Sequence, residues 1–155
     1  MKKKIRIAFI YKKSNVFLDL KHYDTTYYHF FMDALKRNQK ISVTYFPSDN
    51  SFDTTKLKGK FDIILLYENW NHNVPDKLIG IENVGIPVIA RCGDFHAVKR
   101  YDIISYHDKY KIDYYFGFNT KNFFHEFYPK KFNYKTVIFG LEPSLYESVK
   151  SFKDR

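Results

Sequence analysis

Six short apolar runs, separated by polar and helix-like segments, divide this chain at fairly regular intervals. They occupy residues 5–11, 41–46, 61–67, 86–91, 112–118 and 136–141. Residues 61–67 are almost continuously apolar, which is typical of a central strand of a parallel sheet, buried on both faces. Residues 41–46 alternate and stop at a proline, which indicates a strand nearer the edge. The pattern therefore predicts six β-strands.

The segments between the runs carry helix signals. Phe30, Phe31 and Leu35 belong to an apolar series at helical spacing, which predicts a helix from Asp24 or Thr25 to about residue 38. A short helix is expected from Asp53 to Leu57, and Pro75 suits the first position of a helix that carries Leu78, Ile79 and Ile81. The remaining helices are expected at residues 101–110, from Asn119 or Thr120 to Phe127, and in a short turn that Pro143 opens.

Strands joined by helix-length connections pair in parallel through right-handed crossovers. We therefore expect an α/β fold with a doubly wound, mostly parallel six-stranded sheet and helices on both faces. The expected order is Rossmann-like, 3-2-1-4-5-6. A length of 155 residues suits one domain, assigned here to residues 1–149, with a fraying end at residues 150–155.

Composition adds an aromatic core and a basic surface to this picture. The 16 Phe and 14 Tyr predict a core rich in rings. A formal charge of +9 is compatible with nucleic acid, an anionic membrane surface or a phosphorylated ligand. Only Lys2, Lys3 and Lys4 form a cluster, so the charge does not favour nucleic acid, whereas peripheral contact with an anionic membrane stays open.

The single Cys92 excludes an intrachain disulfide and is expected to be a small buried residue in a reducing compartment. No run approaches the roughly 20 apolar residues of a membrane span, and the N-terminus lacks the features of a signal peptide. The expected location is cytoplasmic.

Several familiar chemistries are missing from the loops that follow the strands. The turn after the first strand contains Lys12, Lys13 and Ser14 and has none of the glycine-rich patterns that hold dinucleotides, nucleoside triphosphates or flavin phosphates. It is either a cationic loop that meets a diphosphate or a solvated turn. No nucleophile elbow is present and the six histidines are dispersed, so neither a cofactor nor a metal site is expected.

Two other loops carry candidate chemistry. Glu68, Asn69, Trp70 and Asn71 follow the third strand, a set that suits stacking on and hydrogen bonding to a sugar or nucleoside. The competing interpretation is a polar loop anchored by one buried indole.

The loop after the fourth strand contains Arg91, Asp94 and His96. A carboxylate and an imidazole two positions apart can act together as an acid/base or acceptor-binding pair. Alternatively, Asp94 caps the next helix and His96 has no role.

Three segments resemble a known family: residues 86–91 followed by Gly93-Asp94-Phe95-His96, residues 112–118, and residues 135–146 with their sequence of apolar strand, glycine, acid and aromatic. This succession is similar to the N-terminal, acceptor-side Rossmann-like domain of GT-B glycosyltransferases, in particular GT4-like and spore-coat CgeB-like proteins. The resemblance covers most of the chain through short motifs. It fails at the turn after the first strand, where many members carry a glycine-rich turn.

The resemblance implies a domain that binds a sugar or another hydroxyl-bearing acceptor. The nucleotide-sugar donor would then be bound by a further domain or a partner chain, and this chain would be inactive alone because transfer needs both reactants in one cleft. Asp94 or His96 would be the general base, Trp70 and Glu142 would shape the cleft together with Asn71, and Asn119 after the fifth strand would contact substrate.

Two other classes of function stay open. One is a flavodoxin-like module that binds a small ligand or has a regulatory role, and the other is a basic nucleic-acid-binding or partner-binding protein. Strand order separates the first from the glycosyltransferase, because 3-2-1-4-5-6 fits the transferase and 2-1-3-4-5 favours the binding module.

Overall fold

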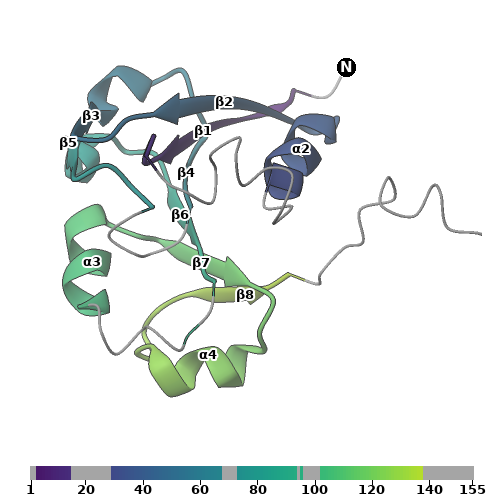
Figure 1. The fold of residues 1–155 in the computed structure, drawn as a ribbon, viewed down its shortest axis with the longest axis vertical. Helices are drawn as coiled ribbons and strands as arrows, with labels where there is room; N and C mark the ends of the chain where they lie inside the picture. The colour runs from purple at the N-terminus through teal and green to yellow at the C-terminus, as the bar shows by residue number, and fades with distance from the viewer. Residues whose placement is uncertain (1–2, 15–28, 68–72, 94, 96–101, 138–155) are drawn as a thin grey trace, which may run out of the picture.

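The computed structural model describes residues 3–14, 29–67, 73–93, 95 and 102–137. Six parallel strands form one sheet in the order β2-β1-β4-β6-β7-β8 (Figure 1). Their bounds are β1 Ile5–Tyr11, β2 Ile41–Pro47, β4 Ile63–Leu66, β6 Val88–Arg91, β7 Tyr114–Gly117 and β8 Tyr134–Thr136. The α-helices are α2 His29–Arg37, α3 Ile103–Tyr110 and α4 Lys121–Phe127.

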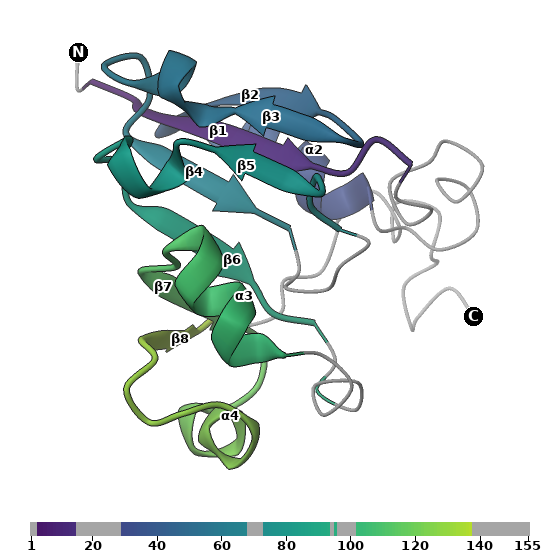
Figure 2. The ribbon, with the colours of Figure 1, turned by 90° about the vertical axis from the view of Figure 1, so that its left-hand side faces the viewer.

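A second, two-stranded sheet pairs β3 (Ser51–Asp53) with β5 (Lys77–Ile79) in parallel. Two short 3₁₀-helices, η2 (Thr54–Leu57) and η3 (Ile81–Asn83), follow these strands. The pair lies over the same side of the main sheet as α3, as Figure 2 shows. The structure thus confirms the short helix expected near residues 53–57.

The six predicted strands are all present, but the predicted order is wrong. When the six strands of this sheet are numbered 1 to 6 in chain order, the observed order is 2-1-3-4-5-6. The third of them, β4, lies between β1 and β6 instead of outside β2. The cause is burial: Ile64 and Leu66 are fully buried on one face and Leu65 is 5 % exposed on the other. Such a strand is most stable with neighbours on both sides.

The helix expected from Pro75 through Ile81 is also wrong. Lys77 and Ile79 are exposed and Leu78 is buried, which is the period of a strand. The backbone N–H groups of Asp76 and Lys77 donate to the carbonyls of Asp49 and Asn50, at 3.1 and 3.0 Å, and so hold this segment beside β3. Gly80 then adopts a positive φ of 74°, which ends any regular helix at that position.

Alternate residues of the strands face two separate core clusters. Ala8, Ile10, Ile64 and Leu66 belong to the larger cluster, which also holds buried side chains of α3, α4 and the β3–β5 pair. The smaller cluster consists of Ile7, Phe9, Leu65 and Tyr67, with Met32 and Leu35 of α2 packed against it. Right-handed crossovers explain the division into two faces. The chain moves in one direction along the sheet from β1 through α2 to β2, and it moves in the opposite direction through the later strands, so the later connections lie on the other face.

The predicted cover of helices along both faces is incomplete within the described residues. On the face of the smaller cluster α2 packs near β1 and β2, while Tyr114 on β7 is 52 % exposed and Val137 just beyond β8 is 48 % exposed. The aromatic core is confirmed on the other face. Phe124 of α4, for example, stacks on Tyr128 and Tyr134 with ring centroids 4.3 and 4.1 Å apart.

The helices expected near residues 101–110 and 119–127 are confirmed, each with an identifiable cap. Asp102 accepts a hydrogen bond from the N–H of Ser105 at the start of α3. Thr120 does the same for Phe123 at the start of α4. Such caps satisfy N–H groups that have no partner within the helix.

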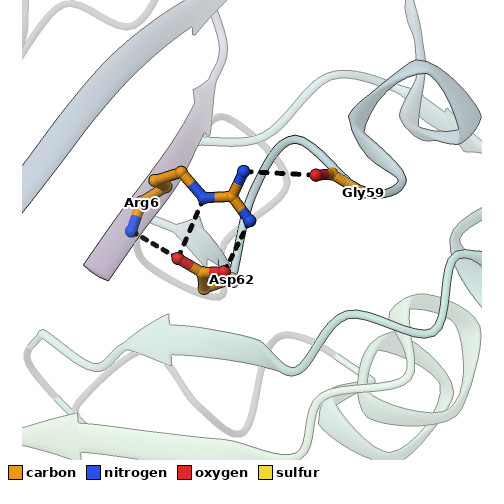
Figure 3. A network of polar contacts seen from close by, with 3 residues as sticks. All are labelled: Arg6, Gly59 and Asp62. Carbon is orange, nitrogen blue, oxygen red and sulfur yellow. Dashed lines mark hydrogen bonds and ion pairs between the residues drawn. The ribbon is translucent and has the colours of Figure 1, made fainter. Parts of the chain in front are cut away.

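An arginine clamp fixes the amino end of the sheet (Figure 3). The guanidinium of Arg6 donates to both carboxylate oxygens of Asp62, at 2.7 and 3.1 Å, and to the carbonyl of Gly59 at 3.2 Å. The backbone N–H of Arg6 adds a further bond to Asp62 at 2.8 Å. These contacts join β1 to the turn before β4, at the edge opposite the candidate site, and they keep the pKa of Asp62 well below its usual range.

Candidate functional site at the carboxyl edge of the sheet

The strand order places the candidate site where β1 and β4 end side by side. From β1 the chain turns back through α2 to β2, whereas from β4 it moves away through β6, β7 and β8. The loops after β1 and β4 therefore lead off in opposite directions. In open α/β sheets this switch point is the usual position of a ligand.

Backbone hydrogen bonds hold the turn after β1 between two other loops. The carbonyl of Tyr11 accepts from the N–H of Ser48 at 3.1 Å, and the N–H of Lys13 donates to the carbonyl of Ser48 at 3.3 Å. On the other side the N–H of Lys12 donates to the carbonyl of Asn73 at 3.0 Å. This turn is thus part of a hydrogen-bonded edge formed by the segments that follow β1, β2 and β4.

The two lysines of this turn have different environments. Lys12 Nζ lies 2.7 Å from Asp76 Oδ1, and the side chain of Lys12 is only 19 % exposed. Asp76 is in turn held by its backbone, since its carbonyl accepts from the hydroxyl of Tyr110 at 3.4 Å and its N–H donates to Asp49. Lys13 is exposed. We conclude that Lys12 connects two loops and that Lys13 is the cation presented to solvent.

Ser14 meets a carboxylate of this chain. Its backbone N–H donates to Asp49 Oδ1 at 2.7 Å. Hydrogen bonds from the backbone and side chain of Ser14 lower the pKa of Asp49, and Lys13 and Lys12 lower it further. The turn therefore stabilises the negative charge of Asp49, and the N–H of Ser14 is used within the chain.

Arg91 ends β6 at the same edge of the sheet. Its guanidinium carbon lies 5.0 Å from the ring centroid of Tyr67, which follows β4 and is almost fully buried. Stacking on an aromatic face orients the planar guanidinium. Lys13, Ser14 and Arg91 are therefore all at the carboxyl ends of strands, with β4 between β1 and β6.

Asn119 follows β7, and its backbone is fixed from β8. Its carbonyl accepts from the hydroxyls of Tyr134 at 3.0 Å and Thr136 at 2.9 Å. The side chain of Asn119 is half-buried. It shares the carboxyl edge with Arg91, but two strands and the switch point separate it from the turn after β1.

Seven of the predicted site residues lie outside the described residues. They are Glu68, Asn69, Trp70, Asn71, Asp94, His96 and Glu142. Their roles stay predictions.

Sequence reasoning missed the acids of this edge. Asp49 and Asp76 carry the contacts of the turn after β1, yet neither belongs to a motif. Asp76 comes directly after Pro75, so it falls in the first turn of the helix expected there, where an acid has an ordinary role beside the helix N-terminus. The usable signal was that Asp49 lies three residues beyond the end of the predicted second strand, at the edge where ligands bind.

The expected burial of Cys92 is confirmed, since this residue is 1 % exposed just beyond β6. Within the described ranges no group of three His, Cys, Asp or Glu side chains is placed to hold a metal ion. The same part of the chain has no helix long and apolar enough to cross a membrane.

Comparison with protein-family models, with curated proteins and with solved structures gives no match for this chain. Its function is therefore argued from the geometry above.

Proposed function

We propose that this chain is a small-ligand-binding domain whose site lies at the carboxyl edge of the sheet, between the ends of β1 and β4. The single observation that carries the proposal is the order β2-β1-β4-β6-β7-β8, which puts the switch point at these two strands. Over its first five strands this is the order that favours a flavodoxin-like binding module.

The ligand that suits this edge carries both an anionic group and hydroxyls. Lys13 and Arg91 supply positive charge for the anionic group. Asp49 and Asp76 supply acceptors for hydroxyl groups. A sugar phosphate or nucleotide sugar meets both requirements, and the predicted loop of Glu68, Asn69, Trp70 and Asn71 would complete the site by stacking and hydrogen bonding.

Calorimetric titration tests this proposal with three probes: a hexose, a hexose phosphate and a nucleoside diphosphate hexose. We expect the two phosphorylated probes to bind and the free hexose to bind more weakly. Lys13→Ala and Arg91→Ala should each weaken phosphorylated-probe binding about tenfold, the value of one charge-assisted contact. The matched control is Lys60→Ala, an exposed lysine before β4 at the opposite edge.

Equal losses of phosphorylated-probe binding in Lys13→Ala and Lys60→Ala would show that only the net charge of the protein matters. The proposed location of the site would then be wrong. Absence of binding by both phosphorylated probes would reject the proposed ligand class.

A second candidate is the acceptor-side domain of a GT-B glycosyltransferase, favoured by one observation. The parallel sheet continues past five strands to β8, so the last of the three segments that resemble this family, residues 135–146, begins in an edge strand of the sheet. In this candidate a donor-binding domain or partner chain completes the enzyme, Asp94 or His96 is the general base, and Glu142 contacts substrate.

The second candidate predicts negligible transfer or hydrolysis of a nucleotide sugar by the pure chain. It also predicts that Asp94→Ala and Trp70→Ala weaken acceptor binding while the circular dichroism spectrum is unchanged. Robust turnover by the chain alone would contradict it.

A further inference from the structure

Exposed lysines gather along the amino edge of the main sheet, opposite the candidate site. They lie in the segments that lead into the strands: Lys3 and Lys4 before β1, Lys40 before β2, Lys58 and Lys60 before β4, Lys111 before β7, and Lys130 and Lys131 before β8. Most of them are far apart in the sequence. The fold brings them together because parallel strands all begin at one edge, where Figure 2 shows the N-terminus.

The register of the strands places three of these lysines side by side. The backbone N–H of Ile5 donates to the carbonyl of Lys40 at 3.0 Å, so Lys4 and Lys40 precede neighbouring strands at the same level. On the other side of β1, the pairing with β4 brings Lys60 to the level of Lys4. Neighbouring strands are about 4.8 Å apart, so the three ammonium groups can reach one anionic surface together.

A second group of lysines lies where β7 and β8 begin. Burial lowers the pKa of His107, and the charges of Lys131 and Lys111 lower it further, which places both lysines near this ring. The ammonium of Lys131 is 5.9 Å from the ring centroid of Phe132, and that ring stacks on His107 with centroids 3.7 Å apart. Both ends of the amino edge are therefore basic.

The positive charge of this edge is not balanced by acids of the described residues. None of the lysines named above forms an ion pair within this part of the chain. Asp62 is already paired with Arg6, and Asp113 accepts a hydrogen bond from the N–H of Val88 at 2.7 Å. The exposed acids in the same connections are fewer than the lysines: Glu82, Asp108 and Glu126.

An anionic membrane surface suits this edge better than nucleic acid does. Lysines are point charges on flexible stems, which attract lipid headgroups without requiring a fixed geometry. Ile5 and Tyr114, the first residues of β1 and β7, are 45 % and 52 % exposed at the same edge. Apolar and aromatic side chains beside cations are typical of surfaces that enter the headgroup region. Arg6, whose guanidinium would suit a phosphodiester, is held by Asp62.

We propose that the amino edge of the sheet is a membrane-contact surface that binds anionic phospholipid. The lysines attract the headgroups, and Ile5 and Tyr114 enter the headgroup region. This orientation directs the carboxyl edge, with the candidate site, toward the aqueous phase. The inference does not depend on the ligand proposed above, which concerns the opposite edge.

Vesicle co-sedimentation with the full chain tests the proposal. Vesicles of phosphatidylcholine alone should leave the protein in the supernatant, whereas vesicles that contain about 30 % phosphatidylserine should bind it at about 0.1 M salt. Raising the salt to about 0.5 M should release the protein, because screening shortens the range of surface charges. Absence of binding to the phosphatidylserine vesicles would overturn the proposal.

Two triple variants with the same net charge locate the contact. Replacing Lys4, Lys40 and Lys60 by alanine should weaken vesicle binding about 100-fold, since each lysine near an anionic surface contributes about fivefold. The matched control replaces three exposed lysines away from this edge by alanine, and it should weaken binding less than about tenfold: Lys77, Lys121 and Lys135. Equal losses in two variants with native circular dichroism spectra would overturn the proposed surface.

Competition with nucleic acid tests the choice of occupant. A DNA oligonucleotide of about 20 nucleotides, added at the same phosphate concentration as the phosphatidylserine, should leave most of the protein on the vesicles. Ile5→Ser together with Tyr114→Ser should weaken vesicle binding at least fivefold, because these side chains contact lipid. Release of the protein by the oligonucleotide would overturn the proposal, since the preferred partner would then be nucleic acid.

Discussion

Replacing Gly80 by alanine distinguishes the observed structure from the one that the sequence pattern predicts, because the two give effects of opposite sign. In a helix that begins at Pro75, Gly80→Ala would stabilise the protein by about 1 kcal/mol. In the structure Gly80 has a φ of 74° between β5 and η3, and an added Cβ would collide with the Cγ2 methyl of Thr55.

Two costs contribute to the expected destabilisation. A left-handed conformation costs alanine about 1–2 kcal/mol, of which part is offset by the lower entropy of the unfolded chain. Overpacking against Thr55 adds about 1–3 kcal/mol. Thr55 cannot simply rotate its methyl away, since its hydroxyl donates to Asp53 Oδ1 at 2.6 Å and a β-branched side chain has few rotamers. The expected loss is about 2–4 kcal/mol.

Gly85 provides the matched control. It has a similar φ of 65°, and an added Cβ would meet no atom within 4 Å, so Gly85→Ala should cost only about 1 kcal/mol. The double variant Gly80→Ala with Thr55→Ser removes the colliding methyl but keeps the hydroxyl. Its cost, relative to Thr55→Ser alone, should fall to that of Gly85→Ala.

Urea unfolding followed by circular dichroism measures all four variants, and unchanged m values would show that the same transition is compared. A stabilising effect of Gly80→Ala would refute the β5 assignment. Equal losses for Gly80→Ala and Gly85→Ala, or no recovery in the double variant, would refute the proposed collision with Thr55.

Three further predictions concern the clamp and the core. Arg6 lowers the pKa of Asp62, so the stabilisation from this pair is complete above the unfolded pKa of about 4 and is lost as pH falls further. Asp62→Asn should therefore reduce the dependence of the unfolding free energy on pH below about 4. An unchanged dependence in this acid range would contradict the prediction. Burial lowers the pKa of His107, so the unfolded state takes up the proton first and stability should decline as pH falls below about 6.5. Differential scanning calorimetry across this pH range should show that decline in the native chain and not in His107→Phe, and equal declines in both would contradict it. Phe124→Ala should lower the free energy of unfolding, measured in urea, by about 3–5 kcal/mol, whereas Phe123→Ala, at a residue that is 41 % exposed, should lower it much less. Similar losses for the two variants would show that Phe124 is not at the centre of the aromatic core.

Local pattern was sufficient for most elements of the fold. The run Ile5–Tyr11 is a strand with those bounds, and Thr120 and Asp53 cap helical turns near their predicted starts. These features depend on residues within a few positions of one another, where apolar periodicity and side-chain capping act directly. The prediction for Lys77–Ile79 was wrong because the partner strand of this segment, β3, is some 25 residues away in the chain. A parallel pairing between such distant segments leaves no local signature in the sequence.

The candidate site was predictable only in part. Lys12, Lys13, Ser14 and Arg91 were identified because they follow predicted strands, and the structure places all four at the carboxyl edge. The difference between Lys12 and Lys13 could not be foreseen, since it depends on Asp76, which is 64 positions from Lys12 in the chain.

The sequence by itself determined six strands, a buried Cys92, an aromatic core and a basic surface, because composition and short-range periodicity encode burial and local conformation. Tertiary structure alone decided the order of the strands, the departure of β3 and β5 into a separate sheet, and the switch point between β1 and β4. Each of these follows from competition among distant segments for the same buried neighbours, and only the folded chain brings those segments together.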